Sequence, residues 1–166
     1  MKIVKADVAD IPAIVSVFLR CWHISYRDIL SQIVRDAMNM ESATELWKKA
    51  FLPDSQKDIY LGLLEGQLVG FFGVGPDRDD NSCGHLFSLY INPDFARQGF
   101  GKILLVAGIR SLISRGFTSM SLWVFKENIA ACSLYSDFGF LPTGKKRVTP
   151  EWEALEIEMS NKNINE

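Results

Sequence analysis

Apolar and polar residues alternate along this chain with two different periods, and the change of period separates expected helices from expected strands. A short strand is expected at Lys2–Lys5. Asp10 is the expected N-cap of a helix, because Pro12 follows it and apolar residues continue at helical spacing to Trp22. A second helix is expected from about Ala43 to Phe51, because a proline two residues further on ends it.

The middle of the chain changes to strand-like runs. The apolar segments Ile59–Leu64 and Gln67–Val74 are separated by Glu65–Gly66, which predicts a β-hairpin. A third strand is expected at His85–Ile91. It ends before Pro93, because proline cannot continue a ladder of backbone hydrogen bonds.

The second half of the chain alternates helices with strands. A helix is expected from Gly99 to Gly116, followed by a strand at Ser119–Phe125, a helix at Asn128–Phe138, and strands from Phe140 onward and at Trp152–Met159. This order predicts an α/β (α+β) fold, a mixed and mostly antiparallel central sheet of about six or seven strands with helices on both faces. We expect a single domain at residues 1–160 and a polar tail at 161–166 that frays.

Composition narrows the classes of function. The 166 residues carry 18 Lys plus Arg against 20 Asp plus Glu, a formal net charge of −2, so no positive excess indicates a nucleic-acid partner. The apolar run Ile103–Ile109 is far shorter than the roughly 18 residues of a membrane span, and the N-terminus lacks the apolar region of a signal peptide. The spacing of the cysteines and histidines predicts a cytoplasmic protein without a metal site.

The segment that follows the third strand carries the most informative motif. A helix is expected to begin inside Gly99-Phe100-Gly101, where the first turn offers unpaired backbone N–H groups and the positive end of the helix dipole. Glycines let an anion approach the backbone, and Arg97 and Lys102 add positive charge. The motif predicts a phosphate or pyrophosphate site built largely from main chain, although a Gly-x-Gly can also serve only as a tight turn.

Two common nucleotide-binding motifs do not fit this segment. The dinucleotide fingerprint requires a third glycine where Leu104 stands. The Walker loop requires Ser or Thr after the lysine, where this chain has Ile103. The phosphate ligand is therefore expected to be held in a different way.

A second motif lies on the helix expected at 128–138. Asn128, Ala131, Cys132 and Tyr135 stand at i, i+3, i+4 and i+7, which places them on one face. An amide, two small side chains and a phenol form a polar groove floor with room for a slim ligand. Asn128 can instead act only as a helix cap, and Tyr135 only as a half-buried aromatic. Together with the glycine motif, the stripe favours a ligand site.

With both motifs in place, the chain resembles the GNAT family of N-acetyltransferases. The resemblance rests on Leu89–Pro93, Arg97–Lys102 and Asn128–Phe140, and it covers about Lys2 to Met159. In one departure, Ala96 occupies the first position of the family's Q/R-x-x-G-x-G/A pattern. That change leaves the backbone cradle of the loop intact.

The resemblance implies transfer of an acetyl group from acetyl-CoA to a primary amine of a small molecule or protein, by direct attack in a ternary complex. Homodimers are common in this family, so the resemblance also makes a homodimer one of the possible assemblies of this chain. A non-catalytic acyl-CoA-binding sensor or interaction module is the alternative. The implied cofactor-binding residues are Leu89, Tyr90, Ile91, Arg97, Gln98, Gly99, Phe100, Gly101, Lys102, Asn128, Ala131 and Tyr135.

The resemblance also suggests catalytic and acceptor-binding residues. Tyr135 is the expected acid for the departing CoA thiolate, because a phenol with a pKa near 10 can protonate it. His85 stands on the strand where the family often has a carboxylate and is a candidate base, although a histidine near a strand start is more often structural. Trp22, Tyr26 and Arg78 are expected near the acceptor. The aspartates beside Arg78 either attract a cationic amine or form an ordinary solvated turn.

Overall fold

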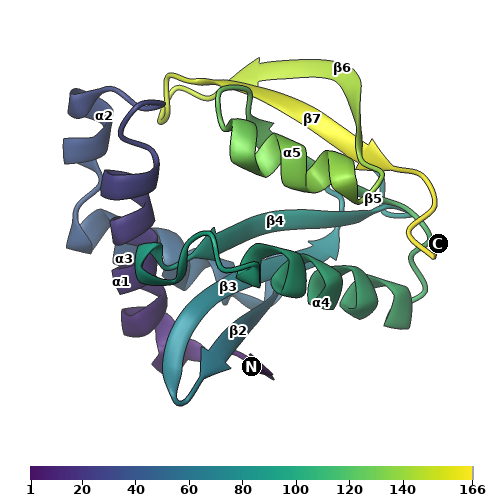
Figure 1. Ribbon diagram of the computed structural model, residues 1–166, viewed down its shortest axis with the longest axis horizontal. Coiled ribbons are helices and arrows are strands. Elements are labelled where there is room, and N and C mark those ends of the chain that lie inside the picture. Colours follow the sequence, from purple (N-terminus) through teal and green to yellow (C-terminus); the bar gives the residue numbers. More distant parts are fainter. Residues whose placement is uncertain (166) are drawn as a thin grey trace.

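The computed structural model describes residues 1–165, which form a seven-stranded sheet in the order β1-β2-β3-β4-β5-β7-β6 (Figure 1). The strands are β1 (Lys2–Lys5), β2 (Asp58–Leu64), β3 (Gln67–Pro76), β4 (Gly84–Ile91), β5 (Met120–Phe125), β6 (Leu141–Val148) and β7 (Leu155–Asn161). Within these residues, β4 and β5 are the one parallel pair. The predicted mixed, mostly antiparallel sheet is confirmed.

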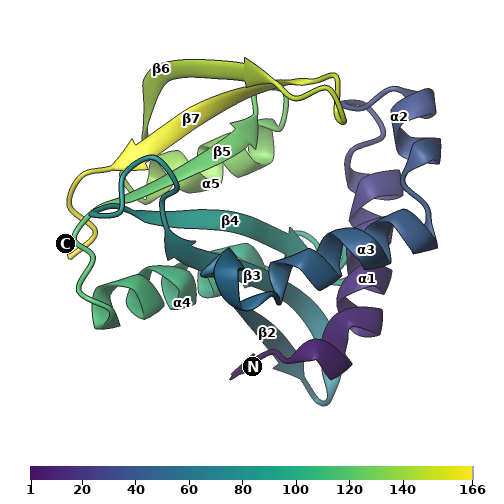
Figure 2. The same ribbon diagram turned by 180° about the vertical axis from the view of Figure 1, so that it is seen from behind.

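Helices cover both faces of the sheet, as predicted. The α-helices are α1 (Ile11–Arg20), α2 (Gln32–Ala37), α3 (Met40–Ala50), α4 (Phe100–Ser114) and α5 (Ile129–Asp137), and the short turns are η1 (Val8–Asp10), η2 (Cys21–Ser25), η3 (Pro53–Ser55) and η4 (Pro93–Phe95). Helices α4 and α5 lie in front of the sheet in Figure 1, whereas α1 and α3 lie in front of it in Figure 2. Each face therefore buries its own hydrophobic cluster.

Strands β4 and β5 pair along only part of their length. Within the described residues, the ladder joins Gly84–Leu86 to Met120–Leu122 and then stops. Beyond it, β4 keeps its pairing with β3, and β5 keeps its pairing with β7. The facing edges of the two strands are thus left without a ladder partner, which is the arrangement that an extended ligand can join by backbone hydrogen bonds.

The start of α1 differs from the prediction. Asp10 has helical backbone angles, φ −83° and ψ −9°, and its side chain makes no capping hydrogen bond to α1. Asp7 is the capping residue instead, because its carboxylate accepts a hydrogen bond from Ala9 N–H at the start of η1. The 3₁₀ turn η1 runs directly into α1, so the cap lies one turn earlier than the apolar pattern indicates.

Residues 8–25 are long and apolar enough to match a membrane-spanning helix by length and composition, and 39% of them are buried. In the fold this stretch comprises η1, α1 and η2, and its buried side chains, such as Ile14 and Phe18, belong to the cluster beneath α1 and α3. An amphipathic core helix explains the match.

Residues 161–165 of the predicted polar tail pack against the domain, whereas residue 166 lies outside the described residues. Strand β7 continues to Asn161, one residue past the expected boundary. Ile164 is 6% exposed and joins the cluster beneath α4 and α5, while its backbone N–H donates to the Thr118 carbonyl at 2.9 Å. Ile164, together with the Asn161 side chain that donates to the Phe138 carbonyl at 2.9 Å, therefore holds this part of the chain against the domain.

Candidate active site

The loop between β4 and α4 forms an open cradle of backbone groups. Gly99 is the N-cap of α4 and has a φ of 84°, a left-handed conformation that glycine adopts without strain. The backbone N–H groups of Phe100 and Gly101 have no hydrogen-bond partner within residues 1–165. Unpaired N–H groups at the positive end of a helix dipole favour an anion, as the sequence predicts.

A clamp that sequence analysis missed holds this loop in place. The Arg20 guanidinium at the end of α1 donates to both Asp94 carboxylate oxygens, at 2.6 and 2.7 Å, and to Asn92 Oδ1 at 2.8 Å. Asn92 in turn donates its backbone N–H to the Val69 carbonyl at 2.8 Å. Bidentate geometry fixes direction as well as distance, so the cradle is tied to both α1 and β3.

A cavity of about 320 Å³ lies beside the cradle, and we call it the glycine-loop cavity. Nine of the predicted cofactor-binding residues line it: Leu89, Ile91, Arg97, Gly99, Phe100, Gly101, Lys102, Ala131 and Tyr135. The cavity thus extends from the cradle to the splayed half of β4. The structure brings the glycine motif together with Ala131 and Tyr135 of the predicted helical stripe, whereas Cys132 does not line the cavity.

The three other predicted cofactor-binding residues are placed differently. Asn128 caps α5, because its side-chain oxygen accepts a hydrogen bond from Ala131 N–H at 3.2 Å. Gln98 is exposed and turns back to the Asp94 carbonyl, at 3.4 Å. Tyr90 points to the opposite face of the sheet from Leu89, because successive residues of a strand alternate.

Tyr135 is buried at the inner end of the glycine-loop cavity, with 7% of its surface exposed. Burial raises the pKa of its phenol well above the ordinary value, and the neighbouring Cys132 thiol adds to the effect. The hydroxyl therefore stays protonated at neutral pH, which is the form that a general acid requires. Burial also raises the pKa of Cys132, so a reactive thiolate is disfavoured there.

A second cavity of about 460 Å³, which we call the aromatic cavity, lies on the other side of β4. Its aromatic lining residues are Phe18, Trp47, Phe87, Tyr90, Trp123 and Trp152, and its polar lining residues include Lys57, Asp77, Arg78, His85, Ser88, Arg147 and Glu156. Leu89 and Ile91 face the glycine-loop cavity, whereas Ser88 and Tyr90 face the aromatic cavity. Strand β4 is therefore a wall that the two cavities share.

Strands β6 and β7 supply part of the aromatic cavity, which sequence analysis did not foresee. The Arg147 guanidinium lies 4.3 Å from the centre of the Trp123 ring and donates to the Glu156 carboxylate at 2.8 and 3.2 Å. Thr149 Oγ1 also donates to this carboxylate, at 2.9 Å. Glu156 is 7% exposed, so its charge is compensated inside the wall of the cavity.

The predicted acceptor residues divide into two groups. Arg78 lines the aromatic cavity, with its guanidinium 5.8 Å from the centre of the Phe87 ring. Trp22 is 2% exposed and packs edge-on against Trp152, at 5.2 Å between ring centres, so in this geometry it supports the cavity wall from behind. Tyr26 packs edge-on against Phe125, at 5.2 Å, and joins η2 to β5.

The aspartate-rich loop forms a structured turn. The Asp77 Oδ1 atom accepts hydrogen bonds from the backbone N–H groups of Asp79 and Asp80, at 2.8 and 3.3 Å. Asp80 accepts from the backbone N–H and the hydroxyl of Ser82, at 2.9 and 2.6 Å. These contacts favour the alternative of an ordinary turn over three free carboxylates that attract a cation.

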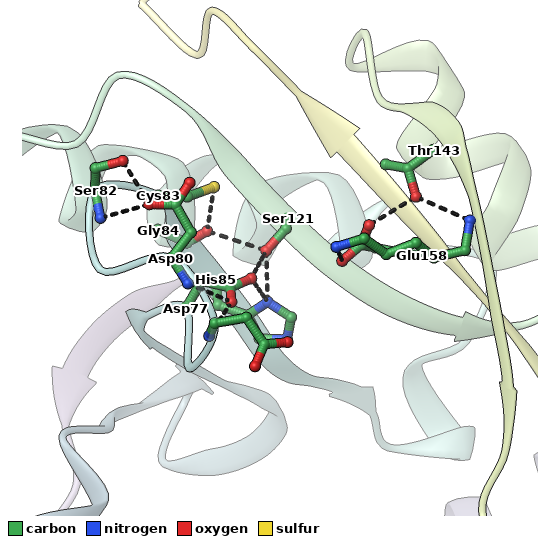
Figure 3. A network of polar contacts seen from close by, with 11 residues as sticks. Asp77, Asp80, Ser82, Cys83, Gly84, His85, Ser121, Thr143 and Glu158 are labelled. Atoms are coloured by element: carbon green, nitrogen blue, oxygen red, sulfur yellow. Dashed lines mark hydrogen bonds and ion pairs between the residues drawn. The ribbon is translucent and has the colours of Figure 1, made fainter.

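His85 lies at the end of the aromatic cavity and is 8% exposed. Its Nδ1 atom is 2.6 Å from Ser121 Oγ and 3.1 Å from Asp77 Oδ2 (Figure 3). Burial lowers the pKa of the imidazole and outweighs the opposing effect of the Asp77 carboxylate. His85 is therefore neutral near pH 7 and can accept a proton.

The sheet order, the splayed β4–β5 pair and the glycine cradle define the fold class of the acetyltransferases of the GNAT type. The chain belongs to this family, because the profile of the acetyltransferase (GNAT) family matches residues 18–140. It is 30% identical over 127 residues to the uncharacterized N-acetyltransferase YuaI of Bacillus subtilis (strain 168), which covers 75% of this chain and 71% of YuaI. It is 42% identical over 96 residues to the [ribosomal protein bS18]-alanine N-acetyltransferase of Escherichia coli (strain K12), over 57% of this chain and 64% of that protein.

Solved structures show the same fold. The ribosomal-protein-alanine N-acetyltransferase from Brucella melitensis superposes with a TM-score of 0.73 at 20% identity, covering 97% of this chain and 99% of that one. The PaiA N-acetyltransferase from Thermoplasma acidophilum, solved in complex with coenzyme A, has a TM-score of 0.71 at 20% identity, covering 95% and 96%. The predicted family, fold and enzyme class are confirmed: the chain is an N-acetyltransferase of the GNAT family.

Proposed function

We propose that the glycine-loop cavity binds acetyl-CoA and that the aromatic cavity holds a primary amine, which attacks the thioester directly. The observation that carries this proposal is the shared wall: from Ser88 to Ile91, successive residues of β4 face the two cavities alternately. A donor along one side of β4 and an acceptor on the other would meet where β4 and β5 have separated.

The glycine-loop cavity fits the chemistry of a CoA thioester. Unpaired N–H groups at the start of α4, with the cationic Arg97 and Lys102 beside them, suit a pyrophosphate. The unpaired edge of β4 beyond Leu86 suits the amides of a pantetheine arm. A β-carbon at Gly101 would lie 3.4 Å from Leu134, at the wall of the same cavity, so glycine keeps the space open without being required by the fold.

Acetyl-CoA supplies an activated acyl group, and residues of this chain supply the proton transfers. In this proposal a backbone N–H of the splayed half of β4, which has no ladder partner on β5, polarises the thioester carbonyl. The neutral phenol of Tyr135 protonates the CoA sulfur as it leaves. His85, which is neutral and lines the aromatic cavity, is the candidate base for the acceptor.

The remaining parts of the proposal concern the acceptor and the location. Arg78 lines the aromatic cavity and makes no ion pair within the residues that the structure describes, so it is available to a polar group of the acceptor. The three cysteines are free thiols, which supports a cytoplasmic location.

A panel of amines tests the proposed function. The purified protein is given acetyl-CoA with polyamines, amino acids, aminoglycosides and peptides with free N-termini, and release of CoA thiol is followed. Mass spectrometry then identifies the acetylated product. We expect at least one amine to be acetylated, and Tyr135→Phe to lose most of this turnover while it still binds acetyl-CoA. Binding of acetyl-CoA without acetylation of any amine would support the non-catalytic sensor instead.

A further inference from the structure

A buried polar cluster lies at the end of the aromatic cavity, where β3, β4 and β5 meet (Figure 3). Asp77 follows the last residue of β3, His85 is the second residue of β4, and Ser121 is the second residue of β5. The parallel ladder pairs His85 with Ser121, so the strand register itself brings these two side chains together. The Ser121 hydroxyl also contacts Asp77 Oδ2, the oxygen that lies 3.1 Å from His85 Nδ1.

The donors and acceptors in this cluster determine which nitrogen of His85 carries the proton. Burial raises the pKa of Asp77, but hydrogen bonds from the Ser121 hydroxyl and the backbone N–H of Asp79, together with His85, lower it overall. Asp77 is therefore ionised and can only accept hydrogen bonds. The single proton of Ser121 is donated to Asp77, so Ser121 Oγ accepts a hydrogen bond from His85 Nδ1–H, at 2.6 Å.

A neutral imidazole that carries its proton on Nδ1 has a lone pair on Nε2. Within residues 1–165, His85 Nε2 has no hydrogen-bond partner. The ring is held by its Nδ1 contacts and by Phe87, whose ring centre lies 4.6 Å away. Because Nδ1 points into the cluster and His85 lines the aromatic cavity, Nε2 is the nitrogen left to face that cavity.

We propose that Asp77 and Ser121 are positioning residues that hold the His85 proton on Nδ1, so that Nε2 takes a proton from the acceptor ammonium, directly or through one water. This inference rests on the function proposed above. The nitrogen of the resulting amine forms its bond to the acetyl carbon as the carbon–sulfur bond breaks. The second proton of that nitrogen replaces the proton that Tyr135 gives to the CoA sulfur, and His85 returns its own proton to solvent.

Charged groups from several elements act on His85. Asp77, from the β3–β4 loop, and Glu158, on β7, raise the pKa of the imidazole, whereas burial and Arg147, on β6, lower it. The net effect is a lowered pKa, so the base is available above a pH that lies below the ordinary histidine value of about 6.5. The kcat/KM for the acceptor should therefore rise with pH through this lowered pKa.

The first experiment measures kcat/KM against pH for Asp77→Asn, with an amine from the panel as acceptor. We expect a loss of about 10²-fold with an unchanged KM for acetyl-CoA, because the base is wrongly protonated. The rising limb of the pH profile should also move to lower pH. The Asp77 carboxylate raises the pKa of His85, so its removal lowers that pKa. Ser121→Ala should lose less, since Asp77 Oδ2 remains 3.1 Å from Nδ1.

Asp80→Asn is the matched control, because Asp80 caps the same loop through Ser82 but is exposed. It should keep the wild-type rate and pH profile. A drop for Asp77→Asn without any shift of the pH profile would overturn the proposal and leave Asp77 a purely structural residue. His85→Gln with wild-type kcat/KM would also overturn it, although acetyl transfer itself would stand.

The second experiment reads the tautomer directly, without turnover. The chain has two histidines, so ¹⁵N NMR of the His23→Gln variant reports on His85 alone. We expect the proton on Nδ1, and a shift toward Nε2–H when Asp77→Asn is added. Nε2–H in the otherwise unchanged protein would contradict the proposal. If the wild type acetylates no amine at all, the proposed function fails and this role for His85 fails with it.

Discussion

The two cavities on either side of β4 are built in different ways. The glycine-loop cavity is formed mainly by one continuous segment, residues 89–102, together with α5. The aromatic cavity collects side chains from α1, α3, β4, β5, the loops around residues 57, 78 and 152, and strands β6 and β7. The first presents backbone N–H groups at a helix start, beside glycines, alanines and bulkier apolar side chains, whereas the second presents mainly aromatic rings and charged groups. A site made from main chain tolerates much sequence change, whereas a site made from side chains can be altered one residue at a time.

The polar groups left unpaired show the same contrast. In the glycine-loop cavity they are backbone N–H groups at a helix start. In the aromatic cavity they include His85 Nε2 and the fully buried side-chain atoms Trp47 Nε1 and Ser88 Oγ, which have no partner within the described residues. An unpaired buried polar group costs about 1–3 kcal/mol, so the Trp47 and Ser88 atoms make the wall of the aromatic cavity less stable than a fully paired one.

The largest effect is expected from Tyr135→Phe, because it concerns the transfer step in which the molecules in both cavities take part. Tyr135→Phe removes only the hydroxyl and keeps the ring, so acetyl-CoA binding should change little while kcat falls by roughly 10²–10⁴. The loss should shrink for an acyl donor whose thiol has a lower pKa, because that thiolate needs less protonation. Stopped-flow or steady-state release of CoA measures kcat, and calorimetry measures binding. Ser136→Ala, one residue further on an exposed part of α5, is the control. Full kcat in Tyr135→Phe, with chemistry limiting the rate, would leave Tyr135 as a packing residue.

The next effect should be confined to the donor side. In Gly101→Val the added side chain would enter the glycine-loop cavity, and a β-carbon there meets Leu134 only at an ordinary contact distance of 3.4 Å. The fold should survive, and the affinity for CoA should fall at least tenfold, about 1.4 kcal/mol. Arg110→Val places a β-branched residue at an exposed position of the same helix and controls for lost helix propensity. Unchanged CoA affinity in a folded Gly101→Val protein would contradict the cradle.

A smaller effect is expected on the acceptor side alone. Arg147→Gln removes the guanidinium that lies over Trp123 and pairs with Glu156. The KM for the acceptor should rise about fivefold, on the scale of 1 kcal/mol, with the affinity for acetyl-CoA unchanged. Lys146→Gln alters the neighbouring, exposed residue of β6 and should have no effect. An equal loss in acetyl-CoA affinity would show that the two cavities do not act separately.

The smallest effect concerns the clamp behind the cradle. The Arg20–Asp94 pair is partly exposed, with 38% and 64% of the side chains accessible, so its contribution is about 1 kcal/mol or less. Asp94→Asn should weaken CoA binding by about twofold to threefold. Arg20→Gln added to it should cost little more, and a double-mutant cycle measures this coupling. Fully additive losses would mean that the two residues act independently.

The donor side could be predicted because its determinants are local. A left-handed glycine, a helix start and the positions of Ala131 and Tyr135 on α5 follow from spacing within short segments, and these residues line one cavity, whereas Cys132 of the predicted stripe does not. Alternation along β4 could also have placed Tyr90 on the opposite face from Leu89, but the family resemblance grouped them together. Asn128 shows where prediction from helical spacing fails. It stands at the start of α5, and its side chain caps the helix and does not line the cavity.

The acceptor side could not be predicted because its determinants are topological. Arg147 and Glu156 reach Trp123 only because β7 inserts between β5 and β6, and no local pattern encodes that strand order. Ser121 meets His85 through the register of a parallel ladder between strands far apart in the sequence. Trp22 is a residue type that often contacts ligands, but here it is buried behind the wall of the aromatic cavity, where it packs against Trp152.

Initial rates with both substrates varied test most directly whether the two cavities are filled at the same time. Direct transfer across β4 requires a ternary complex, so double-reciprocal plots at several fixed amine concentrations should intersect. Incubation with acetyl-CoA alone should leave the protein mass unchanged, since Cys132, the thiol next to Tyr135, is held protonated by a raised pKa. Parallel lines, together with an acetylated protein that passes its acetyl group to the amine, would contradict the account.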